Sequence, residues 1–372
     1  MLYLGNKKVS PVKKVVEIIS EPKFGLTPDS IIGDVNSSGV LQAPTEPGNL
    51  VFDGVTNIAA NALRYRFQYN TAIKSVSFPD LTSLTTTGAM QEAFRSCTGI
   101  TSISFPELKT ISGQSALSSA FYENTGLTSV EFPKLTTISG TSAFNATFYG
   151  CTGLTSASFP NLTTISGSDG AGSMFKGCNH LTSITFPELT SLTRQNGMNS
   201  TLADCTALTT VEFPKLTEVK GNGAMTSLCT NDTSLTTVSF PELQTIGMSS
   251  TAQSTATDAA HFAYAFNNTR VTSLSFPKLE GIYCTRSASA SYGTFYNNNK
   301  VQKMYFPKLT QITYATGASS ANRGACNYVF SNCSALTELH FAAANQAAIE
   351  ASPGYSTAWG RGAGNVTIYF DL

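Results

Sequence analysis

The eight cysteines of the chain could form disulfides, bind a metal ion or act as nucleophiles. Five of them lie eight residues before a phenylalanine: Cys97, Cys151, Cys178, Cys205 and Cys333. Asparagine or aspartate occupies the same position elsewhere, at Asn70, Asn124, Asp232, Asn268 and Asn298. Cys and Asn side chains can both bond backbone groups, so this alternation favours an inward-facing ladder of free, structural thiols over disulfides or a metal site.

The remaining candidates for chemistry are sparse. Cys229, Cys284 and Cys326 fall outside the ladder, and the sequence assigns them no role. The histidines His180, His261 and His340 are isolated. Cys178 and His180 could form a metal pair, although Cys178 already belongs to the ladder. Phosphate loops and nucleophile elbows are absent from the sequence, so we expect no enzyme activity, catalytic residue, metal or cofactor.

These residues are positioned by a repeat centred on a Phe-Pro pair. The repeated phenylalanines are Phe78, Phe105, Phe132, Phe159, Phe186, Phe213, Phe240, Phe276 and Phe306. The first seven are 27 residues apart, and the intervals then lengthen to 36 and 30. A fixed period of this length indicates a solenoid, in which each turn stacks on the next.

The apolar positions of one turn predict its structure. Val130 and Phe132 alternate with polar residues, as in a short strand with one buried face, and Pro133 then ends the strand. Leu135 and Ile138 follow, and a second aromatic lies eleven residues before the central phenylalanine in most turns. Each turn therefore offers about six large apolar side chains to a core that only neighbouring turns can cover.

The chain divides into three parts. Residues 1–45 are predicted to form a small β module with a linker, in which a lysine cluster, Lys7, Lys8, Lys13 and Lys14, protects a sheet edge. Residues 46–345 form the solenoid of about 11–12 turns, with Phe52 in an atypical first turn. Residues 346–372 form a C-terminal cap. An alanine-rich stretch at 342–351 predicts a helix, and 366–370 predicts a closing strand.

Composition excludes several classes of protein. Lys plus Arg and Asp plus Glu both number 23, so no net charge attracts nucleic acid or an anionic membrane. Apolar runs of the roughly 18 residues needed to span a bilayer are absent, and the N-terminus lacks the apolar core of a signal peptide. We expect neither nucleic-acid binding nor membrane insertion.

The repeat motif resembles a known family. Leu-x-x-Val-x-Phe-Pro-x-Leu-x-x-Ile, preceded by segments such as Ala93-Phe94-Arg95-Ser96-Cys97-Thr98-Gly99-Ile100, is similar to BspA-like leucine-rich repeats of bacteria. That resemblance implies a right-handed solenoid with parallel strands and a surface-binding role, and it carries over no catalytic residues. Its usual period is ~23 residues, so 27 is a departure. Residues 1–35 also resemble, less specifically, prophage-encoded virion proteins that dock through a short N-terminal module.

Two functions follow from these resemblances. The first is a phage virion adhesin, a tail or head-fibre protein, that contacts other virion proteins through residues 1–45 and recognises a bacterial surface glycan or protein. It would act on the virion or another extracellular surface. The alternative is a bacterial cell-surface adhesin or interaction scaffold. The sequence leaves open the ligand, the host, the tail or head location and the oligomeric state, homo-oligomers included.

Recognition is predicted where the period lengthens. The extra residues fall at 248–261, 283–293 and 314–327, and insertions in repeat arrays often form binding loops. Tyrosines concentrate there among Ser, Gly and Asn, a composition typical of paratopes. The candidate binding residues are Tyr283, Tyr292, Tyr296, Asn297, Lys303, Tyr305 and Tyr314. Alternatively, these tyrosines pack the insertions onto the solenoid.

Two regular surfaces are also predicted. Small outward residues of the strands, such as Ser102 and Ser129, either allow flat stacking of turns or form an ice-binding or glycan-binding face. Charged residues two places after the central phenylalanine should form a ladder, with Glu107 beside Lys134 and Lys215 between Glu188 and Glu242.

Overall fold

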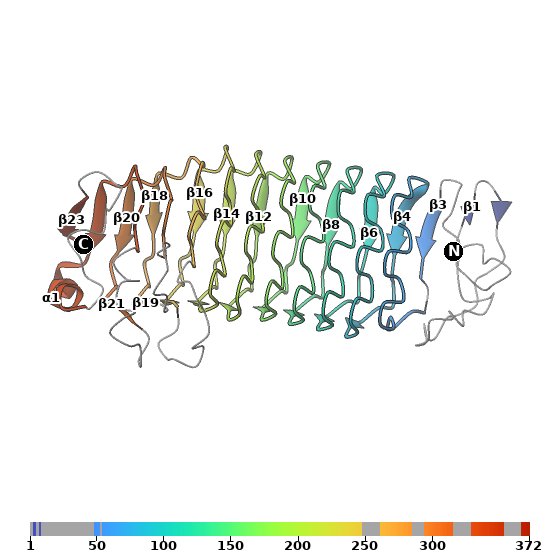
Figure 1. Cartoon of the computed structure of the whole chain (residues 1–372), viewed down its shortest axis with the longest axis horizontal. Coiled ribbons are helices and arrows are strands. Elements are labelled where there is room, and N and C mark those ends of the chain that lie inside the picture. Colours follow the sequence, from blue (N-terminus) through green and yellow to red (C-terminus); the bar gives the residue numbers. More distant parts are fainter. Residues whose placement is uncertain are drawn as a thin grey trace.

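The computed structural model of the chain describes residues 3–4, 7–8, 48–52, 54–247, 261–284, 294–314, 329–352 and 366–372. It is a parallel β-solenoid whose turns follow one another along one long axis, with the two termini at opposite ends (Figure 1). The predicted fold is therefore confirmed.

The first side of each turn is a short strand that ends at the central phenylalanine. These strands are β3 (Gly48–Val51), β4 (Ile73–Ser77), β6 (Ser102–Ser104), β8 (Ser129–Glu131), β10 (Ser156–Ser158), β12 (Ser183–Thr185), β14 (Thr210–Glu212), β16 (Thr237–Ser239), β18 (Ser273–Ser275), β20 (Lys303–Phe306), β22 (Glu338–Phe341) and β23 (Thr367–Phe370). Paired neighbours are parallel, and equivalent residues such as Val130 and Ala157 lie opposite each other. The middle residue of β8 is buried and its two neighbours are exposed, as the alternation predicts.

The second side of the turns forms one continuous sheet. Its nine strands are β5 (Ser83–Leu84), β7 (Thr110–Ile111), β9 (Thr137–Ile138), β11 (Thr164–Ile165), β13 (Ser191–Leu192), β15 (Glu218–Val219), β17 (Thr245–Ile246), β19 (Gly281–Cys284) and β21 (Gln311–Tyr314). The second residue of each of these strands is buried in the core, from Leu84 to Ile312. One continuous sheet therefore covers the second side, whereas the strands of the first side divide among four shorter sheets.

The third side, which we call the long side, is built from four-residue units. Residues in the left-handed region recur every fourth position, as at Ser115 (φ 51°), Ser119 (φ 52°) and Glu123 (φ 55°). Backbone N–H groups alternate between local bonds, such as Ala116 N to Gly113 O, and bonds to the next turn, such as Leu117 N to Ala143 O. One more unit of this kind accounts for a 27-residue period in place of ~23.

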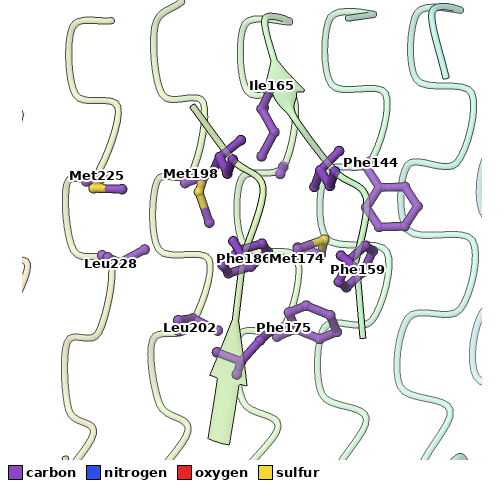
Figure 2. Close-up of a cluster of buried hydrophobic side chains, with 14 of the residues drawn as sticks. Phe144, Phe159, Ile165, Met174, Phe175, Phe186, Met198, Leu202, Met225 and Leu228 are labelled. Carbon is purple, nitrogen blue, oxygen red and sulfur yellow. The ribbon is translucent and has the colours of Figure 1, made fainter. Parts of the chain in front are cut away.

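The core consists of stacked phenylalanine columns. The ring of Phe132 lies parallel to those of Phe105 and Phe159, with centroids 5.5 and 5.4 Å away. A second column runs from Phe67 to Phe175 and continues through Leu202 (Figure 2). Because Leu202 N bonds Leu228 O, the next member of this column is Cys229. This buried thiol, which the sequence pattern left unexplained, replaces a core phenylalanine.

Both ends of the stack carry additional elements. A hairpin of β1 (Tyr3–Leu4) and β2 (Lys7–Lys8) joins β3 in antiparallel fashion, so Lys7 and Lys8 occupy the outer strand of the sheet. Lys13 and Lys14 of the predicted cluster lie outside the described residues. At the other end, η4 (Ala343–Asn345) and α1 (Gln346–Glu350) follow β22, which confirms the predicted helix. The hydroxyl of Ser352, directly after α1, accepts a hydrogen bond from Ile312 N at 3.2 Å. β23 confirms the closing strand, and residues 9–45 of the predicted N-terminal module lie outside the described residues.

In the described part of the chain, none of the helices has the length and hydropathy required to cross a bilayer.

Candidate functional site

The outward side chains of the first strands change character near the C-terminal end. From β4 to β18 these positions carry mainly Ser and Thr, with Glu131 and Glu212 as exceptions. In β20, β22 and β23 they carry larger or charged residues, except at Thr367. We call the resulting group, together with the residue after β23, the terminal cluster: Lys303, Tyr305, Glu338, His340, Tyr369 and Asp371.

Three rings of the terminal cluster form a stack. β20, β22 and β23 pair in register, which sets Tyr305 opposite His340 and His340 opposite Tyr369. The ring centroids are 4.7 Å apart in both pairs, with interplanar angles of 17° and 10°. His340 is buried between the tyrosines, whereas Tyr369 is 38% exposed. Stacked rings lose little conformational freedom when they contact a ligand.

Charged groups bracket this stack. Lys303 Nζ lies 2.8 Å from Glu338 Oε2, and the same carboxylate oxygen lies 3.0 Å from His340 Nε2. The other ring nitrogen of His340 lies 3.0 Å from Asp371 Oδ1. The hydrogen bond between Lys303 and Glu338 lowers the pKa of the Glu338 carboxyl group and raises the pKa of the Lys303 amino group. The cluster therefore presents fixed donors and acceptors beside an exposed aromatic ring.

The structure distributes the candidate binding residues over three sides of the solenoid. Lys303 and Tyr305 belong to the terminal cluster on β20, whereas Tyr283 lies in β19 of the second sheet, where Gln311 Nε2 donates to its hydroxyl at 2.8 Å. Tyr296 and Asn297 lie on the long side, and Asn332 Nδ2 donates to the Tyr296 hydroxyl at 2.6 Å. These residues do not form one surface, because they belong to three different sides of the turn.

Parts of the predicted surface fall outside the described residues. These are Tyr292, the side chain of Tyr314 and nearly all of the three insertions. Conversely, Glu338, His340, Tyr369 and Asp371 escaped the sequence reasoning. One signal in the sequence could have found them: Ser and Thr are lost at the outward positions of the last strands. This change becomes visible only when the turns of unequal length are aligned with one another.

The Asn/Cys ladder lies at the corner that precedes the first strand. Cys151 Sγ donates to Phe121 O at 3.2 Å and Asn124 Nδ2 donates to Phe94 O at 3.0 Å, in each case to the carbonyl thirty positions earlier. Cys97, Cys178, Cys205 and Cys333 make equivalent bonds, and Asn70 accepts from Ala72 N and Ile73 N in the first turn. Burial raises the pKa of the Cys97, Cys151 and Cys333 thiols to about 12. These thiols therefore stay protonated and unreactive at neutral pH.

One predicted member of the ladder is corrected. Asn268 is exposed, and Thr269 occupies the buried position instead. The Thr269 hydroxyl donates to Phe266 O at 2.9 Å and accepts from Val271 N. The phenylalanine columns explain the shift: the second column advances 37 residues from Cys229 to Phe266, whereas the first advances 36 from Phe240 to Phe276.

Asp232 is the acidic member of the ladder. Its Oδ1 accepts a hydrogen bond from Cys205 N at 2.7 Å, and its buried Oδ2 has no partner. Burial raises its pKa from 3.8 to about 9. His261, also fully buried, has its pKa lowered to about 4 by desolvation, and its Nδ1 lies 2.8 Å from Gly221 O. Both groups are neutral at pH 7 and serve the core.

The predicted charge ladder is confirmed. Lys134, Lys215 and Lys278 each lie beside the glutamate of the preceding turn, Glu107, Glu188 and Glu242, with N–O distances of 2.7, 2.7 and 2.6 Å. Asn161 Nδ2 donates to Pro133 O. Among the described residues, no group of three or more His, Cys, Asp or Glu side chains could hold a metal ion.

The sequence matches the family described as BspA type leucine rich repeat region. The two matched segments, 61–195 and 118–257, together cover more than half of the chain. The chain therefore belongs to this family of leucine-rich repeat proteins. None of the curated proteins matches it.

Solved structures with a similar fold include two bacterial leucine-rich repeat proteins. A leucine-rich repeat protein from Bacteroides ovatus ATCC 8483 is 15% identical, with 86% of this chain and 71% of that chain covered and a TM-score of 0.47. A leucine rich cell surface protein from Faecalibacterium prausnitzii A2-165 is 14% identical, with 89% and 98% covered and a TM-score of 0.32. These likenesses concern the repeat fold alone.

Proposed function

We propose that the chain is a non-catalytic adhesin that recognises a bacterial surface, preferentially a glycan, through the terminal cluster. The carrying observation is the replacement of small outward residues by Tyr305, His340 and Tyr369 in three adjacent strands. The exposed ring of Tyr369 can pack on the apolar face of a sugar, and the bracketing charged groups can bond its hydroxyls. His340 is held on both ring nitrogens by carboxylates, which suits a fixed binding surface better than a proton-transfer site.

We further propose that a phage particle carries this adhesin. The resemblance of residues 1–35 to virion proteins supports docking through residues 1–45 to other virion proteins. The geometry is compatible, because the β1–β2 hairpin and the terminal cluster lie at opposite ends of the stack (Figure 1). Attachment at one end would present the other end to a cell.

The second candidate is an adhesin or interaction scaffold on the bacterial cell itself. It is favoured by the family membership, since BspA-like repeats imply a surface-binding role. Both candidates use the same recognition surface and differ only in what holds the N-terminal end.

Binding of the labelled chain to a panel of bacterial cells tests the recognition. A Tyr305→Ser/His340→Ser/Tyr369→Ser variant restores the residue type of the other strands, and we expect it to lose cell binding while it stays folded. Glu107→Ser/Lys134→Ser, which removes an exposed ion pair of the middle turns, is the control and should bind cells normally. Full binding by the folded triple variant refutes the role of the cluster.

The carrier is tested separately. Gold-labelled antibodies against the chain should decorate phage particles released by the strain that encodes it. Label on the cell envelope with bare particles supports the cell-surface alternative.

A further inference from the structure

The outward surface of the long side differs between its two halves. Each four-residue unit directs two side chains inward and two outward, as in the buried pair Ala93 and Phe94 and the outward pair Arg95 and Ser96. In the middle turns the outward residues are mostly small, as at Ser173, Gly177, Asn199, Ser200, Ser227 and Thr230. In the first four turns of the described solenoid they include large aromatic and cationic side chains, and Lys176 continues them into the fifth turn.

Four of these side chains, Arg95, Tyr122, Tyr149 and Lys176, occupy one position in successive turns, and Gln68 occupies it in the first turn. Tyr69 is the next residue after Gln68 and lies at the start of this line. We call Tyr69, Arg95, Tyr122, Tyr149 and Lys176 the aromatic–cation row. Tyr69 N bonds Arg95 O at 2.8 Å, so these two belong to adjacent turns. The Arg95 guanidinium lies 4.4 Å from the centroid of the Tyr122 ring, which stacks on Tyr149 at 4.6 Å, and Lys176 Nζ lies 6.0 Å beyond.

The tyrosines at the start of the row are unusually placed. Tyr65 and Tyr69 are 45% and 65% exposed, and their φ values are 58° and 61°. This left-handed conformation is unfavourable for a bulky residue, and other turns place Gly150 or Gly177 at the position of Tyr69. Such strain at exposed aromatic residues suggests that they are kept for contact with a ligand.

The charges of the row are locally balanced. Glu92 Oε2 lies 3.0 Å from Arg95 Nη1 and also accepts from Gln68 Nε2, while Lys176 Nζ lies 3.8 Å from Asp204 Oδ2. Arg64 packs over the Tyr65 ring at 4.6 Å. Planar hydrogen-bond donors and acceptors therefore alternate with phenol groups along the row. The ion pairs leave the row without a strong net charge, and the whole chain is also neutral.

We infer that the aromatic–cation row is a second binding site, specific for a neutral, linear polysaccharide that runs along the solenoid axis. The exposed rings of Tyr65 and Tyr69 would pack on sugar rings. The phenol groups and the Arg95–Glu92 pair would bond sugar hydroxyls over the following turns. A line of side chains one residue wide matches an extended polymer, because each turn adds one more contact.

Two other ligand classes fit less well. Single-stranded nucleic acid needs free aromatic faces and net positive charge, yet Tyr122 is covered by Arg95 on one face and by Tyr149 on the other. A globular protein partner needs a broad, buried centre surrounded by a polar rim, whereas this row is narrow and bordered by small or polar residues such as Ser96, Glu123 and Gly150.

Affinity electrophoresis of the full chain in gels with soluble polysaccharides tests this site. The probes are hydroxyethyl cellulose, xyloglucan, laminarin, mannan and dextran, with polygalacturonate and poly(dT) as charged probes. We expect at least one neutral probe to retard the chain, with an affinity that stays the same at high salt. Tyr65→Asn/Tyr69→Asn should weaken that affinity about tenfold. Asn tolerates the left-handed backbone, so the variant should fold.

Matched variants separate this site from the terminal cluster. Tyr369→Ser removes an exposed tyrosine at the other end of the stack and should leave the retardation unchanged. Arg95→Gln, which installs the residue type of Gln68, should weaken the retardation, as the double tyrosine variant does. Failure of all five neutral probes, retention of full affinity by the double variant, or tighter binding of polygalacturonate or poly(dT) overturns the inference. Each of these results leaves the cell-binding test of the terminal cluster unaffected.

Discussion

The ring of Phe159 lies parallel to that of Phe132, 27 residues earlier, with centroids 5.4 Å apart and an interplanar angle of 8°. On its other side Phe159 stacks on Phe186 at 6.1 Å. The column therefore couples each turn to both of its neighbours. In a repeat protein, stability is approximately the sum of such nearest-neighbour terms and those within each turn.

Phe159→Ala should cost about 3–5 kcal/mol of unfolding free energy, because the ring is covered by turns on both sides and its removal leaves a cavity. Phe52→Ala, in the first described turn, should cost clearly less. Phe52 is 9% exposed and stacks on the ring of Phe78. Thermal melting of both variants provides the measurement, and equal shifts contradict a linear stack.

The periodic part of the fold could be predicted because strand alternation and the Phe-Pro spacing are visible in the sequence. The long side could not. Its left-handed positions carry residues as different as Tyr65, Ser119 and Asp169, so neither hydrophobicity nor glycine content marks them. The terminal cluster was missed because irregular intervals hide the register that places His340 between Tyr305 and Tyr369.

Asp232→Asn should stabilise the protein at neutral and alkaline pH. The folded-state pKa of Asp232 is raised from 3.8 to about 9, so between these values the folded chain holds a proton that the unfolded chain has released. Its contribution to stability therefore falls as pH rises from about 4 to about 9. Asn at this position can donate to a carbonyl, as Asn124 does to Phe94 O.

Unfolding free energies of wild type and Asp232→Asn, measured from pH 5 to pH 9, check this prediction. The gain should be about 1–3 kcal/mol at pH 8 and should shrink toward pH 5. Because other titrating groups are common to both proteins, the difference isolates Asp232. A gain that does not vary with pH contradicts an uncharged Asp232 in the folded state.

The five ladder thiols and the core thiol Cys229 should resist alkylation in the folded protein. Cys97, Cys151, Cys178, Cys205, Cys229 and Cys333 are buried and free, and desolvation raises the pKa of each. Peptide mapping after iodoacetamide treatment at pH 8 should find these six unmodified, and all of them modified after denaturation. Labelling of Cys151 in the folded chain would contradict its place in the core.

Ladder residues should also be interchangeable by type. Cys151→Asn keeps a donor toward Phe121 O and should change the unfolding free energy by less than about 1 kcal/mol. Cys151→Ala removes this donor, so that Phe121 O keeps only the bond from Asn124 N, and should cost about 0.5–1.5 kcal/mol. Denaturant titration compares the two variants, and an Asn variant that is less stable than the Ala variant refutes the hydrogen-bonding role of this position.

The last prediction separates the insertions from the terminal cluster as recognition surfaces. Tyr283 and Tyr305 lie in different sheets, so the two surfaces can be removed independently. Trimming the insertions until every interval returns to 27 residues should reduce cell binding about tenfold if they border the ligand. Undiminished binding by the folded, trimmed protein, together with loss of binding by Tyr305→Ser/His340→Ser/Tyr369→Ser, would assign recognition to the terminal cluster alone.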